Sequence, residues 1–216
     1  MTMTIVVFLK YPAPGRCKTR LAASIGPEAA AELYREWIAL VLGQLQEFRG
    51  EGRLLGYCDG APVEDFAPWK DLVDGWWVQP EGPLDRRLDA AFRQGHHDSA
   101  RVIALGSDCL DIDASLVRAG FDALATHDVV LGPAFDGGYY LVGTSRHLPG
   151  LFDDVRWSCA DTLADQRKRC QDNDWSHTLL SPRGDIDTWD DWRAYCERRG
   201  IEPAPSSFRG SPPPSP

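Results

Sequence analysis

Three aspartates follow a short apolar segment and are the first residues with the character of a binding site. Residues 102–105 are apolar and partly β-branched, which predicts a buried strand, and Gly106 ends the segment. Ligands of open α/β sheets bind beyond the carboxyl ends of the strands, where Asp108, Asp111 and Asp113 fall. Mg²⁺ takes carboxylate oxygens, often one or two together with substrate phosphates. Asp108 is therefore the candidate metal ligand, whereas Asp113 fits a helix N-cap better and Asp111 fits a solvated side chain.

A basic loop follows the first predicted strand, residues 5–9. It ends by opening a helix, and up to Pro27 it contains four cations and no acidic residue in a chain whose formal net charge is −9. A glycine-containing basic loop that leads into a helix binds phosphates through backbone N–H groups and charged side chains. The alternative is a solvated basic loop, and for Arg16 both interpretations stay open. The candidate phosphate-binding residues are Lys10, Gly15, Arg16, Lys18 and Arg20.

Two further segments have the composition of a site. Asp185 and Asp187 flank one apolar residue, so on an extended backbone both carboxylates point to one face and can hold a cation. The alternative is that one of these acids, or Thr188, caps the last helix. In residues 136–139 a Gly-Gly pair permits a tight turn or a close approach of the backbone to a ligand.

Apolar runs and helical periodicity alternate along the chain, which predicts an α/β protein with a buried parallel sheet. Further strands are expected at 54–58, 78–79, 128–134, 139–142 and 178–180, and helices at 27–48, from Leu84, from Asp113, at 159–170 and over 189–195. Trp69, Trp76 and Trp77 are expected to serve packing.

The 216 residues suit a single domain, expected to span 1–201, followed by a disordered Pro/Ser-rich tail at 202–216. The acidic balance excludes general affinity for nucleic acid or anionic membranes, and no apolar run approaches the length of a membrane span. The six scattered cysteines suit reduced thiols in the cytoplasm.

Four segments together resemble the uncharacterised DUF2064 family, whose members are often labelled glycosyltransferases of the GT-A, nucleotide-diphospho-sugar transferase type. The resemblance runs in order from about residue 5 to residue 195. The chain is also similar, more distantly, to the 2-phospholactate guanylyltransferases. The segments are Phe8–Ala22, Gly106–Cys109, Gly132–Leu141 and Asp185–Thr188, and Leu110 stands where the family usually has proline.

The resemblance implies a Rossmann-like three-layer α/β/α sandwich with a mostly parallel mixed sheet and a nucleotide over its N-terminal half. It implies that Lys10, Lys18 and Arg20 bind the nucleotide phosphates, that Asp108 and Asp187 hold Mg²⁺ or Mn²⁺, and that Asp136, Gly137, Gly138 and Tyr139 line the acceptor side. Asp185 is a further candidate ligand, and Lys18, Arg20 and Asp108 are the candidate catalytic residues.

Three functions remain in view. The first is nucleotidyl transfer from a nucleoside triphosphate to a small phosphorylated or carboxylated acceptor, because a departing pyrophosphate needs several cations. The second is glycosyl transfer from a nucleotide-sugar, and the third is a non-catalytic nucleotide-binding module. The acids at Asp108, Asp185 and Asp187 favour an enzyme over the module. The partners expected are a nucleotide or nucleotide-sugar donor and a small-molecule acceptor; the base, the acceptor and the oligomeric state are left open.

Overall fold

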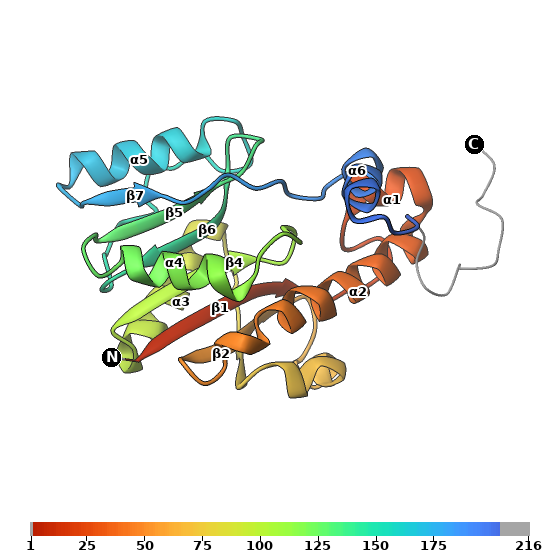
Figure 1. Cartoon of the computed structure of the whole chain (residues 1–216), viewed down its shortest axis with the longest axis horizontal. Coiled ribbons are helices and arrows are strands. Elements are labelled where there is room, and N and C mark those ends of the chain that lie inside the picture. Colours follow the sequence, from red (N-terminus) through yellow and green to blue (C-terminus); the bar gives the residue numbers. More distant parts are fainter. Residues whose placement is uncertain (1, 204–216) are drawn as a thin grey trace.

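A seven-stranded mixed sheet forms the centre of the computed structural model, which describes residues 2–203 (Figure 1). Its strand order is β3-β2-β1-β4-β6-β5-β7, and β6 alone among these strands runs antiparallel to its neighbours. This mostly parallel α/β architecture confirms the predicted fold class. The strands are β1 (Met3–Lys10), β2 (Arg53–Asp59), β3 (Gly75–Val78), β4 (Arg101–Gly106), β5 (Val129–Pro133), β6 (Tyr139–Thr144) and β7 (His177–Leu179).

Helices cover both faces of the sheet because the central strands are apolar on both sides. In β1, Ile5, Val7 and Leu9 enter one hydrophobic core, whereas Val6 enters the other. The first core lies under α1, α2, α4 and α6, and the second lies under α3 and α5. The helices are α1 (Thr19–Ile25), α2 (Pro27–Gln44), α3 (Leu84–Asp98), α4 (Ala114–Ala123), α5 (Thr162–Asp172) and α6 (Trp189–Arg199).

The N-terminal region differs in detail from the prediction. Gly26 has a φ of 86°, a conformation that favours glycine, and it separates the short α1 from α2, which begins at Pro27. The predicted helix over 27–48 ends at Gln44 and continues as a 3₁₀ turn, η1 (Gln46–Phe48). A second 3₁₀ segment, η2 (Val63–Leu72), was not predicted.

Strand β3 begins earlier than the sequence indicated and contains Trp76 and Trp77. Trp76 lies over Gly56 of β2 so closely that a Cβ atom there would come within 2.1 Å of the ring. Trp77 makes an edge contact with Tyr57. The tryptophans therefore serve packing, as predicted.

Two helix caps resolve alternatives that the sequence left open. Asp113 caps α4 by accepting a 2.8 Å hydrogen bond from the backbone N–H of Leu116, which confirms its predicted role. Thr188, rather than Asp185 or Asp187, caps α6 in a reciprocal capping box with Asp191. Asp111 is paired with Arg198 and Arg199 instead of standing free in solvent.

Within residues 2–203, none of the helices combines the length and the apolar character that a membrane crossing demands. Most of the predicted tail, from residue 204 onward, lies outside the described residues.

Candidate functional site

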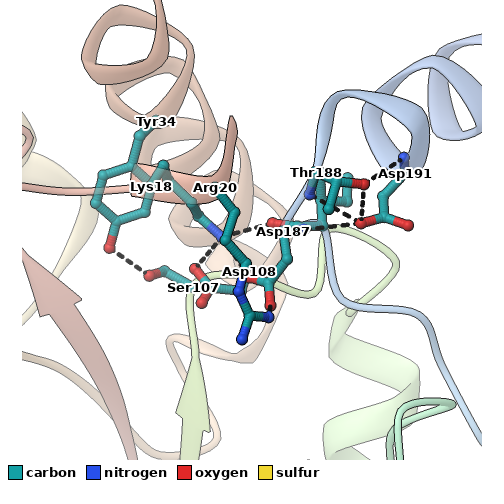
Figure 2. Close-up of polar contacts among 9 residues, drawn as sticks. Lys18, Arg20, Tyr34, Ser107, Asp108, Asp187, Thr188 and Asp191 are labelled. Atoms are coloured by element: carbon teal, nitrogen blue, oxygen red, sulfur yellow. Dashed lines mark hydrogen bonds and ion pairs between the residues drawn. The ribbon is translucent and has the colours of Figure 1, made fainter. Parts of the chain in front are cut away.

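Charged side chains from three distant parts of the chain meet beyond the carboxyl edge of β1 and β4 (Figure 2). The ammonium of Lys18 lies 2.9 Å from Asp108 Oδ1 and 3.6 Å from Asp187 Oδ1. Arg20 binds the other oxygen of Asp187 at 3.0 Å. The structure thus brings together four of the residues that the sequence singled out, although Asp187 is separated from Lys18 by nearly the whole chain.

The loop between β1 and α1 presents the cations. Gly15 adopts a φ of 72°, and a Cβ atom at this position would meet nothing within 4 Å. Glycine is therefore favoured here by the backbone conformation and not by a close contact. Lys18 is the N-cap of α1 and is also left-handed, with a φ of 44°. Its side chain makes no capping hydrogen bond and instead reaches the acids. A non-glycine residue in this conformation costs on the order of 1–3 kcal/mol, and such residues cluster at functional sites.

The segment between β7 and α6 supplies the second acid and part of the lysine's environment. The backbone N–H of Ile186 donates to the carbonyl of Asp108 at 3.0 Å, which ties this segment to the loop after β4. The Ile186 carbonyl accepts a 2.6 Å hydrogen bond from Lys18 Nζ. The capping box at Thr188 then fixes the chain just after Asp187.

Sequence reasoning missed a buried aromatic wall from α2. The Tyr34 hydroxyl shares a 2.7 Å hydrogen bond with Ser107 and accepts one at 3.2 Å from the backbone N–H of Lys10. Burial, together with the nearby Asp108, raises the pKa of Tyr34, so it remains neutral. The Lys18 ammonium also lies 5.2 Å from the Trp37 ring centre. The helical spacing of Tyr34 and Trp37 indicates only an apolar helix face. It does not predict that these side chains contact Ser107 and Lys18.

A polar cleft of about 410 Å³ opens over these residues. Four cations and three carboxylates line it, so positive charge is in slight excess. Arg16 lies on its wall, and Thr19, Tyr34 and Ser158 complete the polar lining. The charged residues are Lys10, Arg16, Lys18, Arg20, Asp108, Asp136 and Asp187.

A mainly apolar pocket of about 240 Å³ adjoins the cleft, and Asp136 and Ser158 line both. Gly138 and Tyr139 line this second pocket together with Trp157, which lies in a loop the sequence did not identify. Gly137 instead lets that loop approach, because a Cβ atom on it would lie 2.2 Å from a backbone oxygen of Ala160.

Asp185 lines a different pocket from the ion-paired group. It lines the apolar pocket, and its Oδ1 atom is buried without a hydrogen-bond partner among residues 2–203. Burial, reinforced by the negative charges of Asp108 and Asp136, raises the pKa of Asp185 to about 7. Asp185 and Asp187 therefore face different pockets, despite the alternation that a regular extended backbone predicts.

The acids suit a divalent cation that shares its coordination with a ligand. Within residues 2–203, no three His, Cys, Asp or Glu side chains are arranged to enclose a metal by themselves. Asp108 and Asp187 provide two carboxylates on one cation position, and the unpartnered oxygen of Asp185 lies nearby. Two carboxylates plus substrate phosphates is the coordination that Mg²⁺ commonly adopts, so these residues fit such an ion.

Comparison with known proteins gives a consistent picture. Residues 57–159 match the model of a family described as uncharacterised proteins conserved in bacteria, DUF2064. A structure from Desulfovibrio desulfuricans G20, provisionally described as a nucleotide-diphospho-sugar transferase, shares 31% identity, with 98% of this chain and 92% of that chain covered and a TM-score of 0.85.

More distant structures share the fold. A cytidylyltransferase from Leptospira borgpetersenii serovar Hardjo-bovis is 13% identical, with 94% of this chain and 89% of that chain covered and a TM-score of 0.60. Rv0371c from Mycobacterium tuberculosis H37Rv, in a complex with manganese, is 19% identical over 91% of this chain and 98% of its own, with a TM-score of 0.53. No curated protein matches the chain.

Proposed function

This chain belongs to the DUF2064 family of bacterial proteins and is a transferase, and from that premise we propose that it catalyses metal-dependent nucleotidyl transfer. The donor is a nucleoside triphosphate, the acceptor is a small phosphorylated or carboxylated molecule, and pyrophosphate is released. The ion is Mg²⁺ or Mn²⁺; the manganese complex of the distantly related Rv0371c supports a divalent ion in a fold of this kind.

One observation carries this proposal: Lys18, Arg20, Asp108 and Asp187 converge on a cleft that two more cations, Lys10 and Arg16, also line. The cleft offers four cations against three carboxylates, and a bound divalent ion would add two further positive charges. A triphosphate is the common donor with enough negative charge to match that total. Preorganised charge of this kind acts most strongly where charge develops in the transition state.

The residues divide the chemistry among them. An oxygen of the acceptor attacks the α-phosphorus of the triphosphate, and the bond from that phosphorus to its bridging oxygen breaks. The electron pair leaves with pyrophosphate, whose charge Lys10, Arg16 and Arg20 neutralise from the loop. Asp108 and Asp187 would hold the metal ion, which when bound supplies further charge neutralisation and orients the phosphates.

The apolar pocket is the proposed site for the body of the acceptor. It meets the charged cleft at Asp136 and Ser158, so a molecule in it could place one polar end next to the phosphates. Gly138 and Tyr139, which the family resemblance implies for the acceptor side, line this pocket.

Glycosyl transfer from a nucleotide-sugar is the second candidate. It is favoured by the provisional description of the 31% identical relative as a nucleotide-diphospho-sugar transferase. In that reaction a nucleoside diphosphate is the leaving group, and the cleft would hold one phosphate fewer.

A coupled pyrophosphate assay separates the two. The protein is incubated with Mg²⁺, each of the four common nucleoside triphosphates and a pool of phosphorylated and carboxylated acceptors. We expect pyrophosphate release that depends on both the acceptor and the metal ion. Consumption of a UDP- or GDP-sugar with release of UDP or GDP, and no pyrophosphate from any triphosphate, would instead establish glycosyl transfer.

Replacing Arg20 with alanine should weaken triphosphate binding by roughly tenfold or more, because hydrogen bonds to charged groups contribute about 1.5–3 kcal/mol. The guanidinium is 72% exposed and its partner Asp187 is held by other contacts, so the fold should be unaffected. Calorimetric titration with a triphosphate and with the bare nucleoside gives the comparison. Equal losses for both ligands would place Arg20 away from the phosphates.

A further inference from the structure

The ammonium of Lys18 occupies the position between the two acids that are proposed to bind the metal (Figure 2). Its side chain is only 6% exposed, and Asp108, Asp187 and the Ile186 carbonyl surround the charge. A buried ammonium requires such partners, because removing an unpaired charge from water is costly. Lys18 is therefore the cation that neutralises these carboxylates in the ligand-free protein.

The lysine and a metal ion cannot use this position together. A divalent ion approaches carboxylate oxygens to about 2.0–2.1 Å in the case of Mg²⁺. The Lys18 ammonium is already 2.9 Å from Asp108 Oδ1, so both cations on the same oxygens would repel each other at close range. One must leave before the other binds.

We propose that Lys18 acts as an internal substitute for the metal, so that free divalent ions bind weakly until a polyphosphate draws the ammonium away. The inference rests on the metal and nucleotide parts of the proposed function. The phosphates first give Lys18 new partners. The two carboxylates then become available, and donor and metal bind together.

The surroundings of Lys18 allow this exchange. Its flexible stem starts from the N-cap of α1, and the residue lines the cleft in which the phosphates are proposed to bind. Lys10 and Arg16 line the same cleft and would attract the phosphates before Lys18 moves.

The test measures Mn²⁺ binding without nucleotide. The paramagnetic resonance signal of the free ion reports how much Mn²⁺ stays unbound. Lys18→Met removes the charge and keeps the length of the side chain, and we expect it to bind Mn²⁺ at least tenfold more tightly than the wild type. Arg20→Met is the matched control: it removes a charge from the same acid, Asp187, but the arginine is 72% exposed. Solvent screens exposed pairs, so the control should change Mn²⁺ affinity much less.

Unchanged or weaker Mn²⁺ binding by Lys18→Met would overturn the proposal, as would an equal gain in the control. A second measurement uses the wild-type protein and does not depend on a variant that folds. The chain has lysines only at positions 10, 18, 70 and 168, so the side-chain resonances of labelled lysine can be assigned singly.

The Lys18 resonance should shift on addition of Mg²⁺ with a non-hydrolysable triphosphate and stay in place with Mg²⁺ alone. A shift with Mg²⁺ alone would contradict the proposal. Failure of the proposed function has a different signature, since the wild type would then bind neither triphosphate nor Mn²⁺ in any combination; that outcome would overturn both.

Discussion

Replacing Asp108 with asparagine should reduce metal-dependent turnover by at least about a hundredfold, a loss of the size that follows removal of one preorganised oxyanion-hole donor. Asparagine keeps the shape of the side chain and removes the negative charge that a divalent ion requires. Lys18 retains Asp187 and the Ile186 carbonyl, and Asp108 is 45% exposed. Because Lys18 keeps these two partners, the ligand-free protein should still fold and its melting temperature should change little.

Turnover is followed by the pyrophosphate assay and stability by thermal unfolding in the presence of a chelator. Asp111→Asn is the matched control, because Asp111 follows the same strand but pairs with Arg198 and Arg199 outside the charged cleft. It should retain activity. An Asp108→Asn protein that unfolds, with full activity in the folded fraction, would show that this carboxylate has a structural role.

Replacing Asp185 with asparagine should change how stability depends on pH. The pKa of Asp185 is about 7 in the folded protein, because of burial and the neighbouring charges of Asp108 and Asp136, and about 3.9 when unfolded. Between these values the folded state holds a proton that the unfolded state has lost, so the wild type loses stability as pH rises toward 7. At about 1.4 kcal/mol per pH unit, and because the loss levels off above pH 7, the loss between pH 5 and pH 8 is about 3 kcal/mol.

Asparagine cannot ionise, so the substitution should remove this pH dependence. The free energy of unfolding of Asp185→Asn should therefore rise relative to that of the wild type by the same amount between pH 5 and pH 8. Denaturant unfolding in chelator at both pH values measures the difference. Asp153→Asn, at an exposed acid that pairs with Arg169, is the matched control. Parallel pH profiles for the wild type and Asp185→Asn would contradict the raised pKa.

Much of the fold followed from local patterns. The apolar runs of β1, β2, β4 and β5 identified the strands because they are buried on both faces. The position of β6 could not be predicted in this way. A buried strand has the same apolar pattern whether it pairs in parallel or antiparallel. Nothing in residues 139–144 therefore indicates that β6 runs antiparallel between β4 and β5. Segment η2 was missed because its 3₁₀ turns contain Pro68 and lack helical periodicity.

For the candidate site, the sequence supplied residue types but not their contacts. Charge segregation pointed to the loop of Lys18, and strand ends pointed to Asp108. The 2.9 Å pair between the two depends on how α1 meets the carboxyl edge of the sheet, which no local pattern encodes. Tyr34 was overlooked because a tyrosine on an apolar helix face is typical of a core residue. Ser158 was overlooked because nothing in the sequence marks its left-handed backbone, with a φ of 58°.

The segment between β7 and α6 has a consequence for the growing protein. The hydrogen bonds from Lys18 to Ile186 and from Arg20 to Asp187 span 168 and 167 residues, so the basic loop leaves the ribosome long before its acidic partners exist. A nascent chain that ends before residue 180 contains Asp108 but not Asp187, so it has only one of the two carboxylates that are proposed to bind the metal. The charged cleft is therefore completed in one late step, when the segment after β7 and helix α6 dock and close a loop of 168 residues.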